Sequence, residues 1–156
     1  MGELLDAVVS YLEEGNYEFR PLTGLSALEV DFAGRHAFYD CRAITDEDAG
    51  LFLFLGRCPL VAPEARRPAV LDLLNRINEG LRIGNFEMDP QAGTIRFRTG
   101  FDVEGVGLAA PLVRNAIGAT VSALDHFLPA VALVIHAGVS PAQALEVPEG
   151  PREDMN

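Results

Sequence analysis

The chain contains no lysine. All twelve of its basic residues are arginine, a bias that fits GC-rich coding in a bacterium. The charge is one-sided, with 23 acidic residues and a formal net charge of -11. Because such a surface repels phosphate backbones and anionic lipids, we expect no direct binding to nucleic acid or membrane. A protein partner with a basic segment is favoured instead, such as a nucleic-acid-binding protein. The alternative is that the charge serves only solubility.

Cysteine is also scarce. Cys41 and Cys58 form no Cys-x-x-Cys pair and have no metal-ligand spacing, which excludes a disulfide framework and a cysteine-based zinc site. Two isolated thiols fit a reducing cytoplasm. The N-terminal stretch has no basic region before its apolar residues, so we expect no secretion signal there and a cytoplasmic protein.

Length and apolar content predict a packed core. The chain has 156 residues, of which 49% are hydrophobic, and a domain of this size needs no covalent staples. We expect one α+β domain over residues 1–146. Residues 147–156 are polar and proline-rich, and we expect them to form a disordered tail.

Hydrophobic periodicity separates helices from strands along the chain. Helical spacing predicts helices at 3–14, 62–80 and 108–138 and a short one from Ser140, while alternation predicts strands at 27–32, 37–44, 51–58, 85–88 and 95–98. A short edge strand within 16–24 is broken by Pro21. This order favours an antiparallel sheet rather than βαβ units.

Two prolines leave local alternatives open. The second helix either starts at Pro63 and bends at Pro68 or truly starts near Arg67. Pro129 either kinks or breaks the long apolar helix. That helix is not predicted to span a membrane, because polar and charged residues interrupt it. The predicted buried stripe of the second helix is Val70, Leu71, Leu73, Leu74 and Ile77.

The segment 85–98 specifies its own register. If residues 89–94 form the turn, Phe86 lies opposite Phe97 and Met88 opposite Ile95, with Glu87 opposite Arg96 on the other face.

The run Leu51, Phe52, Leu53, Phe54, Leu55 is apolar at every position. Such a run indicates a central strand, or a strand whose second face meets another subunit. These five residues are our candidates for a protein-binding or dimer interface.

No residue pattern predicts catalysis, a cofactor or a metal. Gly105, Gly107 and Ala110 have dinucleotide-loop spacing, but no second parallel strand follows and nearby acids would repel a pyrophosphate. His36, His126 and His136 lack metal-ligand spacing, and Asp125 cannot easily orient the ring of its neighbour His126 toward Ser122 in a triad.

Two charged segments are weighed as possible binding sites. The acidic loop 46–50 lacks the spaced oxygens of a calcium loop and is interpreted as solvated. Arg96 and Arg98 share one strand face and are either a small anion or peptide contact or a solvated outer face.

One group of residues within 73–102 forms a pattern typical of a known family: Asn75, Asn78, Gly84, Phe86, Met88, Asp89, Gly93, Ile95, Phe97 and Arg98. With these residues the chain resembles the YbjN family of bacterial sensory-transduction regulators. The later stretch 124–145, with its Ser-Pro-x-x-Ala-Leu end, is similar to the closing helix of the family. The resemblance covers roughly residues 20–145.

The resemblance implies a fold like that of type III secretion chaperones: an antiparallel sheet flanked by three main helices, forming a homodimer. It also implies a non-enzymatic, chaperone-like or regulatory module that binds a protein client in stress or signalling. The alternative is a sensor domain that takes a small ligand between helix and sheet. No catalytic residues carry over from the family.

Overall fold

The structure is a computed structural model in which residues 2–147 are described. Of the tail predicted at 147–156, all but Val147 lies outside the described residues. The elements, in chain order, are α1 (Glu3–Glu14), β1 (Phe19–Pro21), β2 (Ala27–Ala33), β3 (Phe38–Asp46), β4 (Leu51–Val61), a 3-10 turn η1 (Glu64–Arg66), α2 (Arg67–Gly80), β5 (Asn85–Met88), β6 (Thr94–Asp102), α3 (Ala110–His136) and α4 (Pro141–Glu146).

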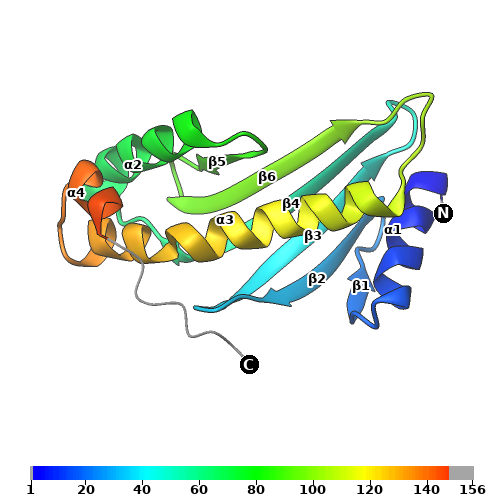
Figure 1. Cartoon of the computed structure of the whole chain (residues 1–156), viewed down its shortest axis with the longest axis horizontal. Coiled ribbons are helices and arrows are strands. Elements are labelled where there is room, and N and C mark those ends of the chain that lie inside the picture. The colour runs from blue at the N-terminus through cyan, green and yellow to red at the C-terminus, as the bar shows by residue number, and fades with distance from the viewer. Residues whose placement is uncertain (1, 148–156) are drawn as a thin grey trace.

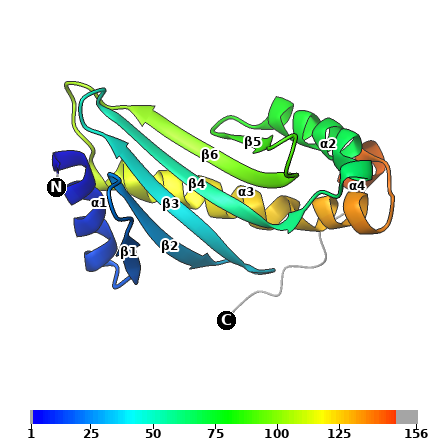
Figure 2. The same cartoon turned by 180° about the vertical axis from the view of Figure 1, so that it is seen from behind.

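The six strands form one antiparallel sheet in the order β1-β2-β3-β4-β6-β5. The long helix α3 runs across one face of this sheet, with α1 at one end and α2 and α4 at the other (Figure 1). Seen from behind, no described helix crosses in front of β2, β3, β4 and β6 (Figure 2). The predicted class, α+β with an antiparallel sheet and three main helices, is confirmed.

The core lies between the sheet and α3. Inward-facing aromatic residues such as Tyr39, Phe52, Phe54 and Phe97 are at most 1% exposed. They pack with the buried faces of the helices, in which α1 contributes Leu5, Val8 and Leu12. The strands alternate between this core face and an outer face, as period-two patterning requires.

The helix α3 continues through Pro129 for 27 residues, so of the two alternatives left open at this proline, a kink or a break, the break does not occur. Buried residues flank the proline on both sides, including Leu124, Ala130 and Val131, and this packing holds the helix together where the proline removes one backbone hydrogen bond. By length and mean hydropathy, 1.6 in its most apolar window, α3 could cross a membrane. The core helix of a soluble protein passes the same test, and ten residues of α3 are buried in this fold.

The start of α2 resolves the other proline alternative. The helix begins at Arg67 after the turn η1, so Pro68 lies in the first turn, where a missing N–H costs nothing. The predicted buried stripe is correct except at Leu71, which is 46% exposed. Leu71 precedes Asp72 on the outer side of the helix and does not reach the core.

The hairpin of β5 and β6 has the predicted register. Phe86 pairs with Phe97, Glu87 with Arg96 and Met88 with Ile95. Asn78 at the end of α2 fixes this hairpin to the helix: its side-chain oxygen accepts the Phe86 N–H at 2.7 Å and its amide donates to the Phe86 carbonyl at 2.9 Å. Gly84, with φ +72°, passes so close to the Phe97 ring that a Cβ atom would lie 2.5 Å from it.

Candidate protein-interaction surface

The five candidate residues of β4 divide between the two faces of the sheet. Phe52 and Phe54 are 0% and 1% exposed and belong to the core. Leu51, Leu53 and Leu55 alternate with them and face outward; Leu51 is 36% exposed and the other two are half-buried. Only these three leucines are therefore available to a partner in the folded chain, and their role as an interface stays a prediction.

The neighbouring strands arrange the outer face into three rows, which we call the outer-face grid. Across β3, β4 and β6, the acidic row is Asp46, Leu51 and Asp102; the middle row is Ile44, Leu53 and Gly100; and the basic row is Arg42, Leu55 and Arg98. Each row consists of directly paired positions, so cross-strand neighbours are in contact range. The leucines form a central apolar column with aspartates at one end and arginines at the other.

Glutamates hold the two arginines of the basic row. Glu87 accepts from Arg98 Nε at 2.7 Å and from Arg96 Nε at 3.0 Å. Partial burial raises the pKa of Glu87, but the hydrogen bonds from Arg96 and Arg98 outweigh this and hold its pKa below the ordinary value. Glu29 similarly bridges Arg42 at 3.1 Å and Arg20 at 2.6 Å. These pairs fix where the positive charges of the outer face lie.

One row further along the strands, Arg57 on β4 is paired directly with Arg96 on β6. Like charges at directly paired positions are destabilising. Arg42, Arg57, Arg96 and Asp40 line a shallow hollow of about 290 Å³ over Leu55 and Gly56. The end of the outer face that carries the basic row therefore concentrates arginines, with the carboxylates of Glu29, Asp40 and Glu87 among them.

The acidic loop 46–50 stabilises the start of α1 at the opposite end of the sheet. Glu47 accepts the backbone N–H groups of Leu4 and Leu5 at 3.2 and 3.1 Å, so its carboxylate caps the N-terminus of α1. Asp46 Oδ1 accepts the Ala49 N–H at 3.0 Å within the turn. Within residues 2–147, no group of three or more His, Cys, Asp or Glu side chains is placed to hold a metal ion.

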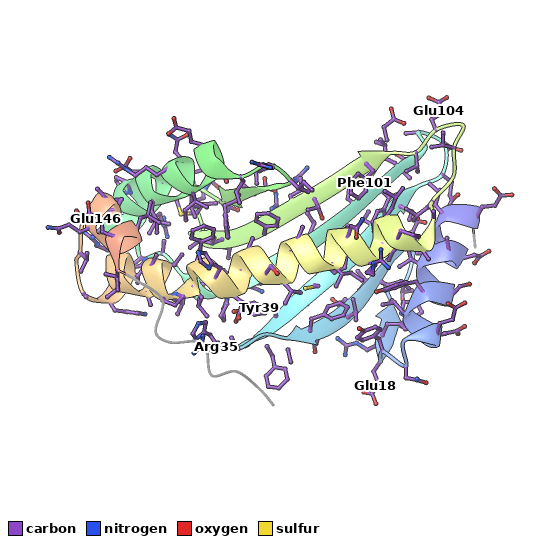
Figure 3. All side chains as sticks on the ribbon, in the orientation of Figure 1. Glu18, Arg35, Tyr39, Phe101, Glu104 and Glu146 are labelled. Atoms are coloured by element: carbon purple, nitrogen blue, oxygen red, sulfur yellow. The ribbon has the colours of Figure 1, made fainter. Side chains whose placement is uncertain are left out.

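Asp125, which sequence spacing placed near a histidine and a serine, instead fastens the turn between β2 and β3 to α3. Its carboxylate accepts the N–H groups of Arg35 and His36, both at 2.8 Å, and the hydroxyl of Tyr39 at 2.7 Å. Figure 3 shows Arg35 and Tyr39 together beneath α3. With all three donors directed at it, Asp125 is a structural acceptor rather than a member of a catalytic triad.

The histidines are only partly brought together. His36 and His126 line a hollow of about 260 Å³ with Phe127, Leu133 and Leu145, between α3, α4 and the turn after β2. His136 is exposed at the end of α3. Gly105 and Gly107 lie in the loop between β6 and α3 with φ +74° and +76°, and the antiparallel sheet provides no parallel strand pair for a dinucleotide.

Sequence reasoning did not select Arg42, Ile44, Gly100 and Asp102 for the outer face. Their alternation along β3 and β6 is visible in the sequence, but the rows depend on which residues of distant strands are paired. Arg96 and Arg98 were recognised as an outer-face pair, and both bind Glu87.

The fold is similar to that of several solved structures. YbjN from E. coli matches with a TM-score of 0.59 and 17% identity, over 84% of this chain and 93% of that one. A chain of the ExsC-ExsE complex matches with a TM-score of 0.60 and 8% identity, over 82% and 95%. A chain of the HopA1-SchA chaperone-effector complex gives 0.53 and 11%, over 81% and 94%. At these identities the likeness shows the fold alone, a type III secretion chaperone-like sheet with helices on one face.

The family follows from the sequence. The YbjN family model, described as "Putative bacterial sensory transduction regulator", matches residues 4–144. The chain belongs to the YbjN family, which confirms the resemblance. A search of curated protein sequences found no match.

Proposed function

We propose that this protein is a non-enzymatic, chaperone-like or regulatory module that binds a protein client and works as a homodimer in the cytoplasm. The proposed unit is a single domain over residues 1–146. The observation that carries the proposal is the column of Leu51, Leu53 and Leu55 on a sheet face that no described helix covers. A contiguous apolar surface rimmed by charge is characteristic of a protein contact, with a second copy of the chain or with a client.

The family and the fold support a binding role. The family is described as regulatory, and one of the similar structures is a chaperone-effector complex. The net charge of -11 favours a partner with a basic or Arg-rich segment, because the field of the protein steers such surfaces toward it. A nucleic-acid-binding protein would meet this description without direct contact between this chain and nucleic acid.

The test is recovery and reconstitution of the client. The tagged chain, expressed in its source organism and cross-linked in the cell, is purified and its bound proteins are identified. We expect one protein to be enriched over a tag-only control and to bind the purified chain again in vitro. Failure of every recovered protein to bind again would contradict the proposal.

The hollow between α3, α4 and the turn after β2 favours a second candidate, a small-ligand sensor. It has apolar walls from Phe127 and Leu133 and two imidazoles, His36 and His126, but its volume of about 260 Å³ is small. A ligand present at a hundredfold excess over its dissociation constant would stabilise the fold by ~2.7 kcal/mol. A thermal-shift screen with metabolites, in the absence of any protein partner, separates the two functions.

A further inference from the structure

The outer-face grid has a chemical direction along its strands. On β3 the outward residues are Asp46, Ile44 and Arg42, and on β6 they are Asp102, Gly100 and Arg98. Both strands run antiparallel to β4, so both place aspartate at the same end of the leucine column and arginine at the other. The face therefore carries negative charge, apolar surface and positive charge in sequence.

A surface of this kind is complementary to itself in one orientation. Consider two copies that face each other, related by a twofold axis that lies along the middle row. The rotation reverses the strand direction but leaves each strand opposite the same strand of the second copy. The two ends of the grid are therefore exchanged. The acidic row of each copy then faces the basic row of the other. A twofold axis parallel to the strands would instead face the acidic rows with each other and is disfavoured by repulsion.

We infer that this face of the sheet is the homodimer interface, formed with a second copy of the chain about a twofold axis along Ile44, Leu53 and Gly100. This inference rests on the homodimer of the proposed function and specifies its geometry. Leu53 meets its own counterpart at the axis, and Leu51 meets Leu55 of the second copy. Asp46 lies over Arg42 of the second copy and Asp102 over Arg98.

The middle row allows the sheet of a second copy to approach closely. Gly100 has no side chain, and Leu53 lies so near it that a Cβ atom at residue 100 would be 2.5 Å from Leu53 Cδ2. Leu53 therefore partly fills the space that a side chain at residue 100 would take. With Ile44 half-buried on the other side, the middle row forms a low apolar surface that a second sheet could pack against.

The charged rows are already positioned for such a contact. Arg42 and Arg98 are held by Glu29 and Glu87, and each guanidinium has further donors for a second carboxylate. One carboxylate oxygen of Asp46 and of Asp102 accepts a local backbone N–H, which leaves the other oxygen for a partner.

The test reverses the charges of each row in a separate variant. The molar mass of each variant in solution is then measured by light scattering at micromolar concentration. One variant reverses the basic row, Arg42→Glu with Arg98→Glu, and the other reverses the acidic row, Asp46→Arg with Asp102→Arg. We expect wild type to have the mass of two chains and each variant alone the mass of one, with the dissociation constant raised at least ~100-fold. An equimolar mixture of the two variants should recover the mass of a dimer.

Two single substitutions keep the test independent of the folding of the swapped variants. Leu53→Asp places two carboxylates at the axis and should give a monomer with an unchanged helix signal, whereas Leu71→Asp, on the exposed side of α2, should leave the dimer intact. In addition, a short bismaleimide should join two copies of a Leu53→Cys variant, because residue 53 lies at the axis, and should not join a Leu71→Cys variant. The two native thiols are buried and should not react.

The outcomes separate this inference from the function on which it rests. A monomeric wild type would contradict the proposed homodimer and this interface together. A wild-type dimer that survives both row reversals, or that Leu71→Asp dissociates while Leu53→Asp does not, would contradict the interface alone. Failure of the mixed variants to reassociate, with both folded, would also overturn it.

Discussion

The hydroxyl of Tyr39 on β3 donates a 2.7 Å hydrogen bond to Asp125 Oδ1 on α3, between residues 86 positions apart in the chain. The same carboxylate accepts the N–H groups of Arg35 and His36. Gly34 leaves room for it, since a Cβ atom there would lie 2.4 Å from Asp125 Oδ1. One side chain thus fastens the end of the β2–β3 hairpin to the helix that covers the core.

We expect Asp125→Ala to lower the free energy of unfolding by about 2 kcal/mol, because it removes a charged acceptor and leaves three donors to find water. Asp125→Asn keeps one acceptor oxygen and should cost less. Denaturant unfolding measures both changes. Asp72→Ala is the control: it removes an exposed i,i+4 pair with Arg76 and should cost under ~0.5 kcal/mol. Equal losses for Asp125→Ala and Asp72→Ala would contradict the role given to Asp125.

Asp125 also predicts acid sensitivity. Partial burial raises its pKa, but the hydrogen bonds from His36, Tyr39 and Arg35 outweigh it and hold the pKa below the ordinary value. The folded state therefore releases this proton more easily than the unfolded state. The resulting stabilisation is complete above the unfolded pKa of ~3.9 and is lost as the pH falls through the folded pKa. Unfolding curves from pH 6 to pH 2.5 should show a smaller loss for Asp125→Asn than for wild type; parallel losses would count against it.

The glycine before β5 should not tolerate a side chain. Gly84→Ala would put a Cβ atom 2.5 Å from the Phe97 ring and 2.8 Å from the Arg98 carbonyl, at φ +72°. We expect a loss of about 2 kcal/mol by thermal or denaturant unfolding. Gly80→Ala is a matched control, since nothing lies within 4 Å of its added Cβ atom at the end of α2. It should be neutral or slightly stabilising, and equal effects at the two glycines would contradict this explanation.

Both thiols should be inert in the folded protein. Cys41 and Cys58 are 0% and 3% exposed. Burial, with smaller contributions from Asp40 and Asp31, raises the pKa of Cys41 to about 12, and burial also raises the pKa of Cys58. Alkylation at pH 8 followed by intact mass should therefore show no modified thiol in buffer and two per chain in denaturant. Rapid labelling of native protein would indicate that the core opens under these conditions.

The rate of client binding should depend on salt. Two chains of net charge -11 sum to about -22, and a field of that sign speeds encounter with a basic surface while apolar contacts hold the complex. Between low and physiological ionic strength, the association rate of the identified client should fall by more than the dissociation rate rises. An association rate that does not change with salt concentration would exclude electrostatic steering of the client. A gel shift of naked DNA at physiological salt would also exclude it.

Local pattern determined much of the secondary structure from the sequence alone. The alternation of Phe86, Met88, Ile95 and Phe97 across a short turn predicted the register that β5 and β6 adopt. Here both strands lie within a few residues of each other, so the turn leaves little freedom in how they pair. Helical spacing likewise located α1, α2 and α3, and the residues of the hairpin and the closing helix carried the family.

Tertiary structure decided which faces are covered. The sequence marks Leu51 to Leu55 as apolar on both sides, but only the packing of α3 makes Phe52 and Phe54 core and leaves Leu51, Leu53 and Leu55 outside. The rows of the outer-face grid join Asp46 and Leu51 to Asp102, far along the chain. Asp125 reaches a turn nearly 90 residues away. Short-range periodicity specifies each strand or helix by itself, whereas contacts between distant elements depend on how all of them share one core.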